Sequence, residues 1–413
     1  MARRETSAGP GSRALIVDLI RSSGPISRVE LTAATGLTQP AVSIIVRKLI
    51  QDGLVRETGS TTPTAGKPRT LLTINARAVI AIGIQLGVED SVFVAVDSTG
   101  GIFGRQGFAG AGVDAPQVVI DRLVDDYRAF LDGLGADESR VAGVAVVAPG
   151  PINVERGLVV GPPSLRRWVD FPLRDAFARR VGPPVLVDND SAASAVGEFW
   201  TRQISRESTY ACLYMGGGIG AGLVSSGALY RGSSSNTTEL GHVSIDLNGR
   251  DCFCGNRGCV ERYAAPSAVV AEARSDARLA DELELDTEVV RAFDAIARAA
   301  VQGHPRALDL IVASARHLAE ATVNFANIVD PDSITLAGWG FAIAGSIYAR
   351  EIGAVLAERA FARRAHGIDV ALSSNPRDSA AVGAAALILQ SSLTPGHGPA
   401  LHEAHAGDGD AII

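Results

Sequence analysis

The 413-residue sequence contains no run of eighteen apolar residues, and its first residues lack the apolar core of a signal peptide. It has only four cysteines, and no segment repeats at a fixed period. The missing apolar segments exclude an ordinary membrane-spanning helix and argue against secretion. We therefore expect a cytoplasmic protein with no membrane partner.

Charge is distributed unevenly along the chain. Hydrophobic residues make up 46% of it and charged residues 20%, which is enough for sizeable cores in two or three domains. The net charge is −7, yet residues 1–76 contain ten basic and five acidic side chains, a balance of +5. A basic head on an acidic body is expected where only the head meets nucleic acid.

The cysteines that are present cluster. Three of the four fall within residues 252–261, just after the segment Glu239-Leu240-Gly241-His242. Three thiolates and one imidazole form a closed tetrahedral set that is typical of structural zinc. The predicted zinc ligands are His242, Cys252, Cys254 and Cys259. A chance disulfide beside buried thiols is the alternative, although a reducing compartment favours metal.

The basic head has the pattern of a winged helix-turn-helix. Apolar residues recur at helical spacing from Arg13 to Ser23, and Gly24-Pro25 ends that helix. Ser27 and Glu30 form the pattern of a capping box for a second helix, and Thr38 caps a third. In the third helix the expected inward residues are Val42, Ile45, Val46 and Leu49. The residues left facing DNA are Thr38, Gln39, Ser43, Arg47 and, at the edge, Lys48.

Two short strands, 54–56 and 70–74, flank a wing that is rich in Ser, Thr, Pro and Gly. The wing contains Lys67 and Arg69, which suit phosphates or the minor groove. The sequence thus predicts a DNA-binding domain over residues 1–76. A small helical protein-interaction module with an incidental basic face is the alternative.

The body alternates strand and helix patterns, which predicts a two-lobed α/β domain over residues 77–393. The expected elements are a hairpin over 79–97, strands at 141–148 and 184–187, a glycine-rich hairpin over 213–224, a mostly helical stretch over 264–327, a strand at 333–336 and a helix over 379–390. The strand at 184–187 delivers Asp188-Asn189-Asp190 at its end. Residues 394–413 are expected to form a disordered tail.

An ordered series of motifs resembles the ROK family of sugar-responsive repressors and sugar kinases, from roughly residue 13 to residue 390. The motifs are Ala148-Pro149-Gly150-Pro151, Asn189-Asp190, Glu239-Leu240-Gly241-His242 and the Cys-x-Cys-Gly-x-x-Gly-Cys-x-Glu segment at 252–261. The resemblance implies a hexokinase/actin-like ATPase fold behind the head.

The resemblance also implies a sugar site. Its expected contacts are Asn189, Asp190, Glu239, His242 and Glu261. If one ring nitrogen of His242 binds zinc, the other carries the proton and donates towards the sugar. The alternative for Glu239 and Glu261 is a structural role, capping helices or pairing with arginines. Thr238 stands where the family usually has glycine, which leaves the identity of the sugar open.

The nucleotide side departs from the kinase pattern. Where kinases of the family have Gly-Ile-Asp-x-Gly-Gly-Thr, this chain has Gln85 in place of the acid and Val88-Glu89 in the phosphate-wrapping turn. An amide cannot supply the carboxylate charge for Mg²⁺, and Glu89 faces the phosphates with a negative charge. Trp339 interrupts a turn that is usually all glycine. Asp190 occupies the general-base position of the kinases.

These features predict a sugar-responsive transcriptional regulator, a repressor of carbohydrate uptake or catabolism genes, without kinase activity. Its expected partners are a small sugar, a double-stranded operator with an inverted repeat, and further copies of itself in a dimer or tetramer. The alternative is an active sugar kinase with an appended DNA-binding head. A third hypothesis, a scaffold that binds no DNA, is discouraged by the +5 head.

Overall fold

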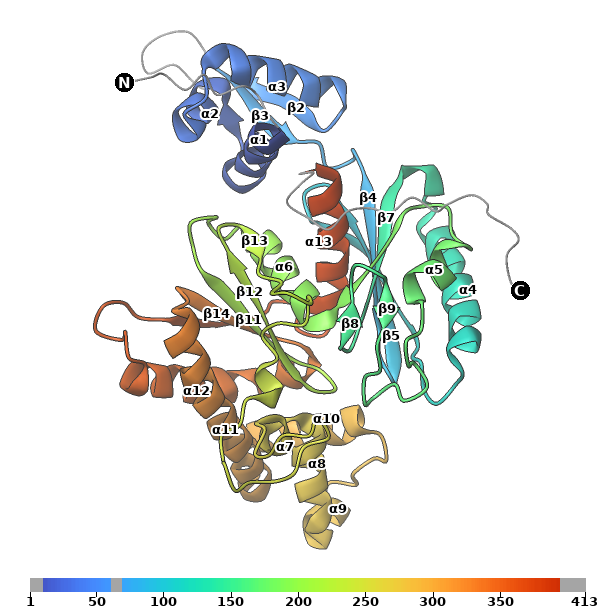
Figure 1. Ribbon diagram of the computed structural model, residues 1–413, viewed down its shortest axis with the longest axis vertical. Helices are drawn as coiled ribbons and strands as arrows, with labels where there is room; N and C mark the ends of the chain where they lie inside the picture. The colour runs from blue at the N-terminus through green and yellow to red at the C-terminus, as the bar shows by residue number, and fades with distance from the viewer. Residues whose placement is uncertain (1–9, 61–68, 394–413) are drawn as a thin grey trace.

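A small helical head and two α/β lobes make up the residues that the structure describes, 10–60 and 69–393, in this computed structural model (Figure 1). The head lies at one end of the long axis. The helices α6 (Asp190–Thr201) and α13 (Ser379–Leu393) lie between the two lobes. The predicted order of a winged helix-turn-helix followed by a two-lobed body is confirmed.

The head is built from three helices and a three-stranded sheet of order β1-β3-β2. Its elements are α1 (Pro10–Ser23), β1 (Ile26–Ser27), α2 (Arg28–Thr35), α3 (Gln39–Gln51), β2 (Val55–Ser60) and β3 (Thr70–Ile74). Both predicted caps are present: Ser27 and Glu30 form a complete capping box on α2, and the Thr38 side chain accepts a hydrogen bond from the Ala41 N–H. The sequence analysis missed only the two-residue strand β1.

The first lobe contains a five-stranded sheet of order β10-β7-β4-β5-β6. Its strands are β4 (Ile80–Leu86), β5 (Asp90–Asp97), β6 (Ile102–Ala109), β7 (Val141–Ala148) and β10 (Val185–Asn189). The helices α4 (Pro116–Leu134) and α5 (Leu173–Ala178) share one hydrophobic core with this sheet, and α13 packs on its other face. The short strands β8 (Ile152–Asn153) and β9 (Leu158–Val159) form a separate pair beside it.

The second lobe contains another five-stranded sheet, of order β13-β12-β11-β14-β15, and most of the helices. The strands are β11 (Tyr210–Met215), β12 (Ile219–Ser225), β13 (Ala228–Leu229), β14 (Ser333–Ala337) and β15 (Asp369–Leu372). The helices are α7 (Glu261–Ala264), α8 (Pro266–Ser275), α9 (Ala277–Glu282), α10 (Val289–Val301), α11 (Pro305–Val329) and α12 (Gly345–Arg359). The predicted strands and the predicted helical stretch correspond to elements of this lobe, whereas β13, α12 and β15 were not anticipated.

Two of the sequence predictions fall partly or wholly outside the described residues: most of the wing, including Lys67, and the tail 394–413. Among residues 10–60 and 69–393, no helix combines the length and the apolar content that crossing a membrane requires.

Candidate functional site

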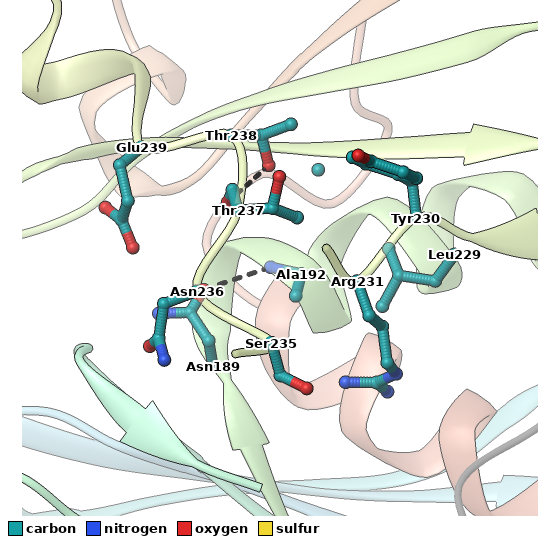
Figure 2. Close-up of a pocket in the computed structure, with 11 residues that line it drawn as sticks. Asn189, Ala192, Leu229, Tyr230, Arg231, Ser235, Asn236, Thr237, Thr238 and Glu239 are labelled. Carbon is teal, nitrogen blue, oxygen red and sulfur yellow. Dashed lines mark hydrogen bonds between the residues drawn. The ribbon is translucent and has the colours of Figure 1, made fainter. Parts of the chain in front are cut away.

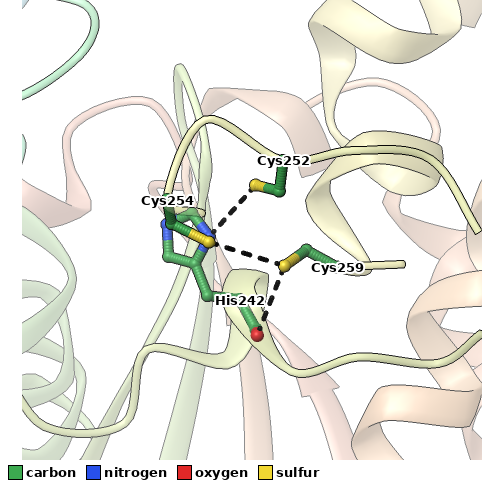
Figure 3. Close-up of side chains that lie close together, drawn as sticks. All are labelled: His242, Cys252, Cys254 and Cys259. Carbon is green, nitrogen blue, oxygen red and sulfur yellow. Dashed lines mark hydrogen bonds between the residues drawn. The ribbon is translucent and has the colours of Figure 1, made fainter. Parts of the chain in front are cut away.

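The four predicted metal ligands come together in one cluster (Figure 3). The ligand atoms of His242, Cys252, Cys254 and Cys259 all lie within 4.8 Å of one another. The Cys254 and Cys259 sulfurs are 3.7 Å apart, and the Cys252 sulfur is 3.6 Å from Nδ1 of His242. A tetrahedral ion with metal–sulfur bonds of ~2.3 Å separates sulfur from sulfur by ~3.8 Å and nitrogen from sulfur by ~3.6 Å. The cluster therefore fits a four-coordinate metal ion.

The chemistry of the donor set points the same way. Burial, together with the adjacent Cys254 and Cys252, raises the pKa of Cys259 to about 12. Three thiolates this close together repel one another unless a cation neutralises them. Nδ1 of His242 faces the sulfurs, so Nε2 is the nitrogen left for a ligand outside the cluster.

The carboxyl end of β10 delivers Asn189 to the predicted sugar site. Its Oδ1 accepts hydrogen bonds from the N–H groups of Ser191 at 2.9 Å and Ala192 at 3.1 Å, so it caps the start of α6. A Cβ added to Gly150 would lie 2.9 Å from Nδ2 of Asn189 and 3.7 Å from Oε1 of Glu239, so both groups face that glycine. Because the helix uses its oxygen, Asn189 offers a ligand mainly the Nδ2 donor.

Asp190 is the first residue of α6 and lies half-buried beside Glu239. Desolvation raises the pKa of Asp190 to about 7; the Glu239 carboxylate acts in the same direction, and the hydrogen bond from the Ser191 N–H opposes it. Desolvation also raises the pKa of Glu239, with His242 lowering it and Glu261 raising it. The two carboxyl groups of Asp190 and Glu239 thus share one poorly solvated space, in which they prefer hydrogen-bond donors.

Glu261 begins α7 and reaches back to the glycine-rich hairpin. Its Oε2 accepts a hydrogen bond from the Ile219 N–H at 2.8 Å, and a Cβ on Gly218 would lie 2.4 Å from that oxygen. A Cβ on Gly241 would lie 3.0 Å from it. Glu261 therefore makes an intramolecular contact with β12, but within the described residues it neither caps a helix nor pairs with an arginine, and its other oxygen makes no hydrogen bond there.

Thr238 adopts a backbone conformation that glycine adopts freely. Its φ is +57°, in the left-handed region that a β-branched residue rarely occupies. The Thr238 hydroxyl lies 2.6 Å from the carbonyl oxygens of both Ala221 and Thr237, and this holds the residue in place. The departure from glycine noted in the sequence therefore leaves the turn before Glu239 intact.

The segment before Glu239 closes over α6 (Figure 2). It leaves a cavity of about 10 Å³, room for roughly one water molecule and too small for a sugar. The Asn236 side chain bonds both backbone groups of Ile152, at 2.8 and 2.9 Å, and so ties the segment to the first lobe. Arg231 pairs with the buried Asp188, with Nη2 and Oδ2 2.6 Å apart. The sequence analysis missed these contacts because nothing in the local pattern relates positions so far apart.

On the nucleotide side, the residues that replace the kinase motif bind other parts of the protein. Nε2 of Gln85 in β4 donates a hydrogen bond to the Tyr214 hydroxyl in β11 at 2.9 Å, across the two lobes. Glu89, in the turn after β4, accepts hydrogen bonds from the N–H groups of Val289 at 3.0 Å and Val290 at 3.4 Å. Glu89 therefore provides an anion to the amino-terminal end of α10, where unpaired N–H groups favour negative charge.

The retained glycines of the second hairpin have structural reasons to be there. Besides Gly218, a Cβ on Gly220 would lie 2.7 Å from the Ser191 hydroxyl, and one on Gly222 would lie 2.4 Å from the Ala195 Cβ. These glycines let β12 approach α6 closely. The unexpected Trp339 packs edge-on against Phe293 of α10, with ring centroids 5.9 Å apart.

The head presents the outward face that the sequence predicted. Buried α3 residues are Val42, Ile45, Val46 and Leu49. Gln39, Arg47 and Lys48 are exposed and Ser43 is half-buried, while Lys48 pairs with Asp52 at 2.9 Å. Arg69, at the near end of the wing, is exposed as well.

A groove of about 610 Å³ lies between α3, the start of α2 and β2. It is lined by Arg28, Ser43, Arg47, Ile50, Gln51, Val55, Arg56 and Glu57. The sequence analysis did not select Arg28 or Arg56, although their positive charge was the available signal. It also did not select Ile44, which is 62% exposed on α3.

Comparison with known proteins identifies both parts of the chain. Residues 81–391 match the ROK family, and residues 14–56 match a winged helix-turn-helix DNA-binding domain. The chain belongs to the ROK family. The ROK match covers both lobes, including the metal cluster and every predicted sugar contact.

Relatives of this ROK protein include named repressors. It is 25% identical over 387 residues to the xylose repressor of Caldicellulosiruptor bescii, covering 93% of this chain and 96% of that protein. It is 30% identical over 256 residues to the xylose repressor of Bacillus subtilis, covering 62% and 66%. It is 26% identical over 329 residues to the DNA-binding transcriptional dual regulator NagC of Escherichia coli, covering 79% of each.

Solved structures include both branches of the family. A ROK family transcriptional regulator described as a homolog of the E. coli MLC protein superposes with a TM-score of 0.75 at 26% identity, over 93% of this chain and 96% of that chain. A ROK family glucokinase from Streptomyces griseus, in complex with glucose and AMPPNP, superposes with a TM-score of 0.64 at 28% identity. That likeness covers 75% of this chain and 98% of the glucokinase, so the glucokinase has no counterpart for a quarter of this chain.

Proposed function

We propose that this ROK protein is a sugar-responsive DNA-binding transcriptional repressor whose body binds a sugar and does not phosphorylate it. The observation that carries the proposal is the combination of a winged helix-turn-helix head with a body that brings together the polar residues predicted to contact a sugar. The repressor names of relatives that span head and body support the same function. By this proposal the operator is an inverted repeat bound by a dimer or tetramer.

The metal in the cluster is zinc, held by His242, Cys252, Cys254 and Cys259. A closed four-ligand set leaves no open position for water, so the ion supplies fixed geometry and charge neutralisation. With Nδ1 on the metal, Nε2 of His242 carries the proton and donates a hydrogen bond to a sugar oxygen. Glu239, three residues earlier, accepts from a sugar hydroxyl, as does Asp190.

Loss of phosphoryl transfer follows from what replaces the kinase motif. Phosphoryl transfer depends on positioning the phosphates and neutralising their charge with Mg²⁺ and nearby donors. Gln85 supplies an amide that is bonded to Tyr214, and Glu89 already provides the anion at the start of α10. Asp190 remains available to polarise a hydroxyl, which alone contributes only ~10²–10⁴-fold to a reaction.

A thermal-shift screen with monosaccharides and their phosphates tests the sugar site, because a ligand of the native state raises its stability. Selection from random double-stranded DNA tests the head. We expect one sugar class to raise the melting temperature and to weaken binding to the selected DNA. Absence of any sequence preference over competitor DNA at moderate salt would refute the regulator, and ATP turnover with a sugar would favour the kinase alternative.

A further inference from the structure

The helix α6 begins in the sugar site and ends against the DNA-binding head. Its cap is Asn189 and its first residue is Asp190, both predicted sugar contacts. Its penultimate residue is Trp200, some ~15 Å further along at 1.5 Å per residue. One continuous helix therefore spans the distance between the predicted sugar site and the DNA-binding head.

At the far end, α1 of the head binds the carboxyl terminus of α6. Nη1 of Arg21 donates a hydrogen bond to the Trp200 carbonyl oxygen at 2.9 Å, and the guanidinium lies 4.3 Å from the centre of the Trp200 ring. A positive charge at the last carbonyls of a helix is favourable, and stacking on an indole face adds to it. Arg21 thus makes two different contacts with one residue of the body.

This contact is buried, and it includes two further charged side chains, one from the head and one from the body. Arg21 is 8% exposed, Asp18 7% and Trp200 4%. Asp18 pairs with Arg21 at 2.8 Å within α1, and it also faces Arg206 of the body at 3.5 Å. Charge-assisted hydrogen bonds in a buried setting are strong and directional, so the head has a defined orientation on α6.

The helix α6 packs backbone to backbone against α13. Where α6 crosses α13, Gly197 faces Gly383: a Cβ on Gly197 would lie 2.7 Å from the Gly383 Cα. With no side chain between the two backbones, a displacement of α6 acts directly on α13, and packed helices are known to move past one another by small amounts in shear motions. The Trp200 Nε1 is also buried without a hydrogen-bond partner within the described residues, so no hydrogen bond from the indole fixes its position there.

We infer that Arg21, Asp18 and Trp200 form the joint through which sugar binding at the start of α6 reorients the DNA-binding head. This inference rests on the proposed function. Arg21 is a positioning residue: it acts through α1 and touches neither sugar nor DNA in this role.

The test is the ratio of operator affinities with and without sugar. The probes are the selected operator and whichever of D-xylose, N-acetylglucosamine and glucose raises the melting temperature. Couplings of this kind typically change affinity by ~5–150-fold. In Arg21→Met we expect the ratio to fall to within about twofold of one. The sugar dissociation constant without DNA should stay within about threefold of wild type, since the sugar contacts are untouched.

Linkage supplies a second readout. In the wild type, operator DNA must change sugar affinity by the same factor by which sugar changes operator affinity. That reciprocal effect should vanish with Arg21→Met, which a merely stabilising role for Arg21 would not cause. Arg316→Met is the control, because Arg316 pairs with Glu351 at 3.3 Å on the surface of the second lobe. It should keep the wild-type ratio.

The outcomes separate the inference from the function beneath it. A wild-type protein without sugar response or operator binding would refute the proposed function. A responsive wild type with an unchanged ratio in Arg21→Met, or an equal loss in Arg316→Met, would overturn the joint alone. Should Arg21→Met fail to fold, Arg21→Lys provides the test. Lysine keeps a positive charge beside Asp18 but loses the planar stacking on the Trp200 ring. Its ratio should fall, and a wild-type ratio there would overturn the inference.

Discussion

Glu89 of the first lobe accepts a hydrogen bond from the Val289 N–H at the start of α10, in the second lobe, across 200 positions of sequence. A carboxylate in this place satisfies N–H groups that the helix itself leaves unpaired. The Glu288 side chain stands at the cap position of α10 and makes no capping hydrogen bond. The anion that completes α10 therefore comes from the other lobe, and it links the two lobes.

Replacing Glu89 with alanine should lower the free energy of unfolding by about 1 kcal/mol, the usual contribution of a helix cap. Denaturant titration measures it. Glu89→Gln retains an acceptor and should lose less. Glu288→Ala, the neighbouring control, should change stability by no more than a few tenths of a kcal/mol. Equal losses in Glu89→Ala and Glu288→Ala would contradict the capping role.

The protein should not turn over ATP with hexoses, pentoses or N-acetylated amino sugars. Gln85 and Glu89 are committed to contacts between the lobes, and neither supports a Mg²⁺–phosphate complex. A coupled ADP-release assay measures turnover, with Asp190→Asn as the comparison. The wild type and this variant should give the same background. Turnover of ~1 s⁻¹ or more, the low end of ordinary kinases, would show that the kinase alternative is right.

Sugar affinity should rise with pH between about 6 and 8. The pKa of Asp190 is raised to about 7, and a sugar hydroxyl donates to its ionised form. Well below that pKa, affinity should increase by up to ~10-fold per pH unit, and it should level off above it. Calorimetry across this range measures the effect, with Asp190→Asn expected to flatten the curve. The Glu239 carboxylate contributes to the raised pKa of Asp190, so a Glu239→Gln variant measures how much of the pH dependence comes from Glu239.

The free energy of unfolding should also depend on the ionisation of Asp190, but it should fall with pH where the sugar affinity rises. A carboxyl whose folded pKa lies above its unfolded value binds more protons in the native state. The free energy of unfolding contributed by Asp190 is therefore greatest below pH ~4 and decreases as pH rises to about 7. Comparing the pH dependence of unfolding in the wild type with Asp190→Asn isolates this contribution. No difference between their slopes from pH 5 to 7 would contradict the raised pKa.

One zinc ion per chain should accompany the protein purified without chelator. Cys259→Ser should abolish both metal binding and the sugar response. The metal site that fixes His242 would lose its most buried sulfur ligand. Elemental analysis and the thermal-shift screen measure the two effects. Cys212→Ser is the matched control. Cys212 is a buried cysteine outside the cluster, with its sulfur 3.7 Å from the Ser194 hydroxyl, and its replacement should leave zinc in place. Retained sugar response without zinc would refute the link between cluster and sugar site.

The operator should be an inverted repeat with half-sites ~10 or ~20 bp apart. Arg47→Ala should weaken specific binding by roughly 1–3 kcal/mol if Arg47 contacts a base. Lys67→Ala and Arg69→Ala should instead weaken binding to all sequences and reduce its salt dependence. Competition assays at several salt concentrations separate the two effects. If Arg47→Ala weakened binding to specific and random DNA equally, Arg47 would be assigned to a phosphate contact and not to a base contact.

Features that depend on neighbouring residues could be predicted from the sequence. The caps Ser27 and Thr38 and the inward face of α3 follow from spacing within a few residues, and the structure confirms each. The cysteines of the metal cluster occupy one short loop, so their proximity is also local. The ROK motifs, kept in order along the chain, predicted the two lobes.

Only the tertiary structure decided what lies opposite these elements. No pattern in the sequence relates Glu89 to Val289, Gln85 to Tyr214, or Arg21 to Trp200, because each pair is brought together by the packing of separate elements. Desolvation likewise sets the pKa of Asp190, and it depends on everything that surrounds the group. The sequence by itself determined the helix caps and the clustering of the candidate metal ligands, since short-range geometry suffices for them, and its ordered motifs determined the family. The coupling of the lobes and of the head to α6 arises from contacts between distant residues, which exist only once the chain has folded.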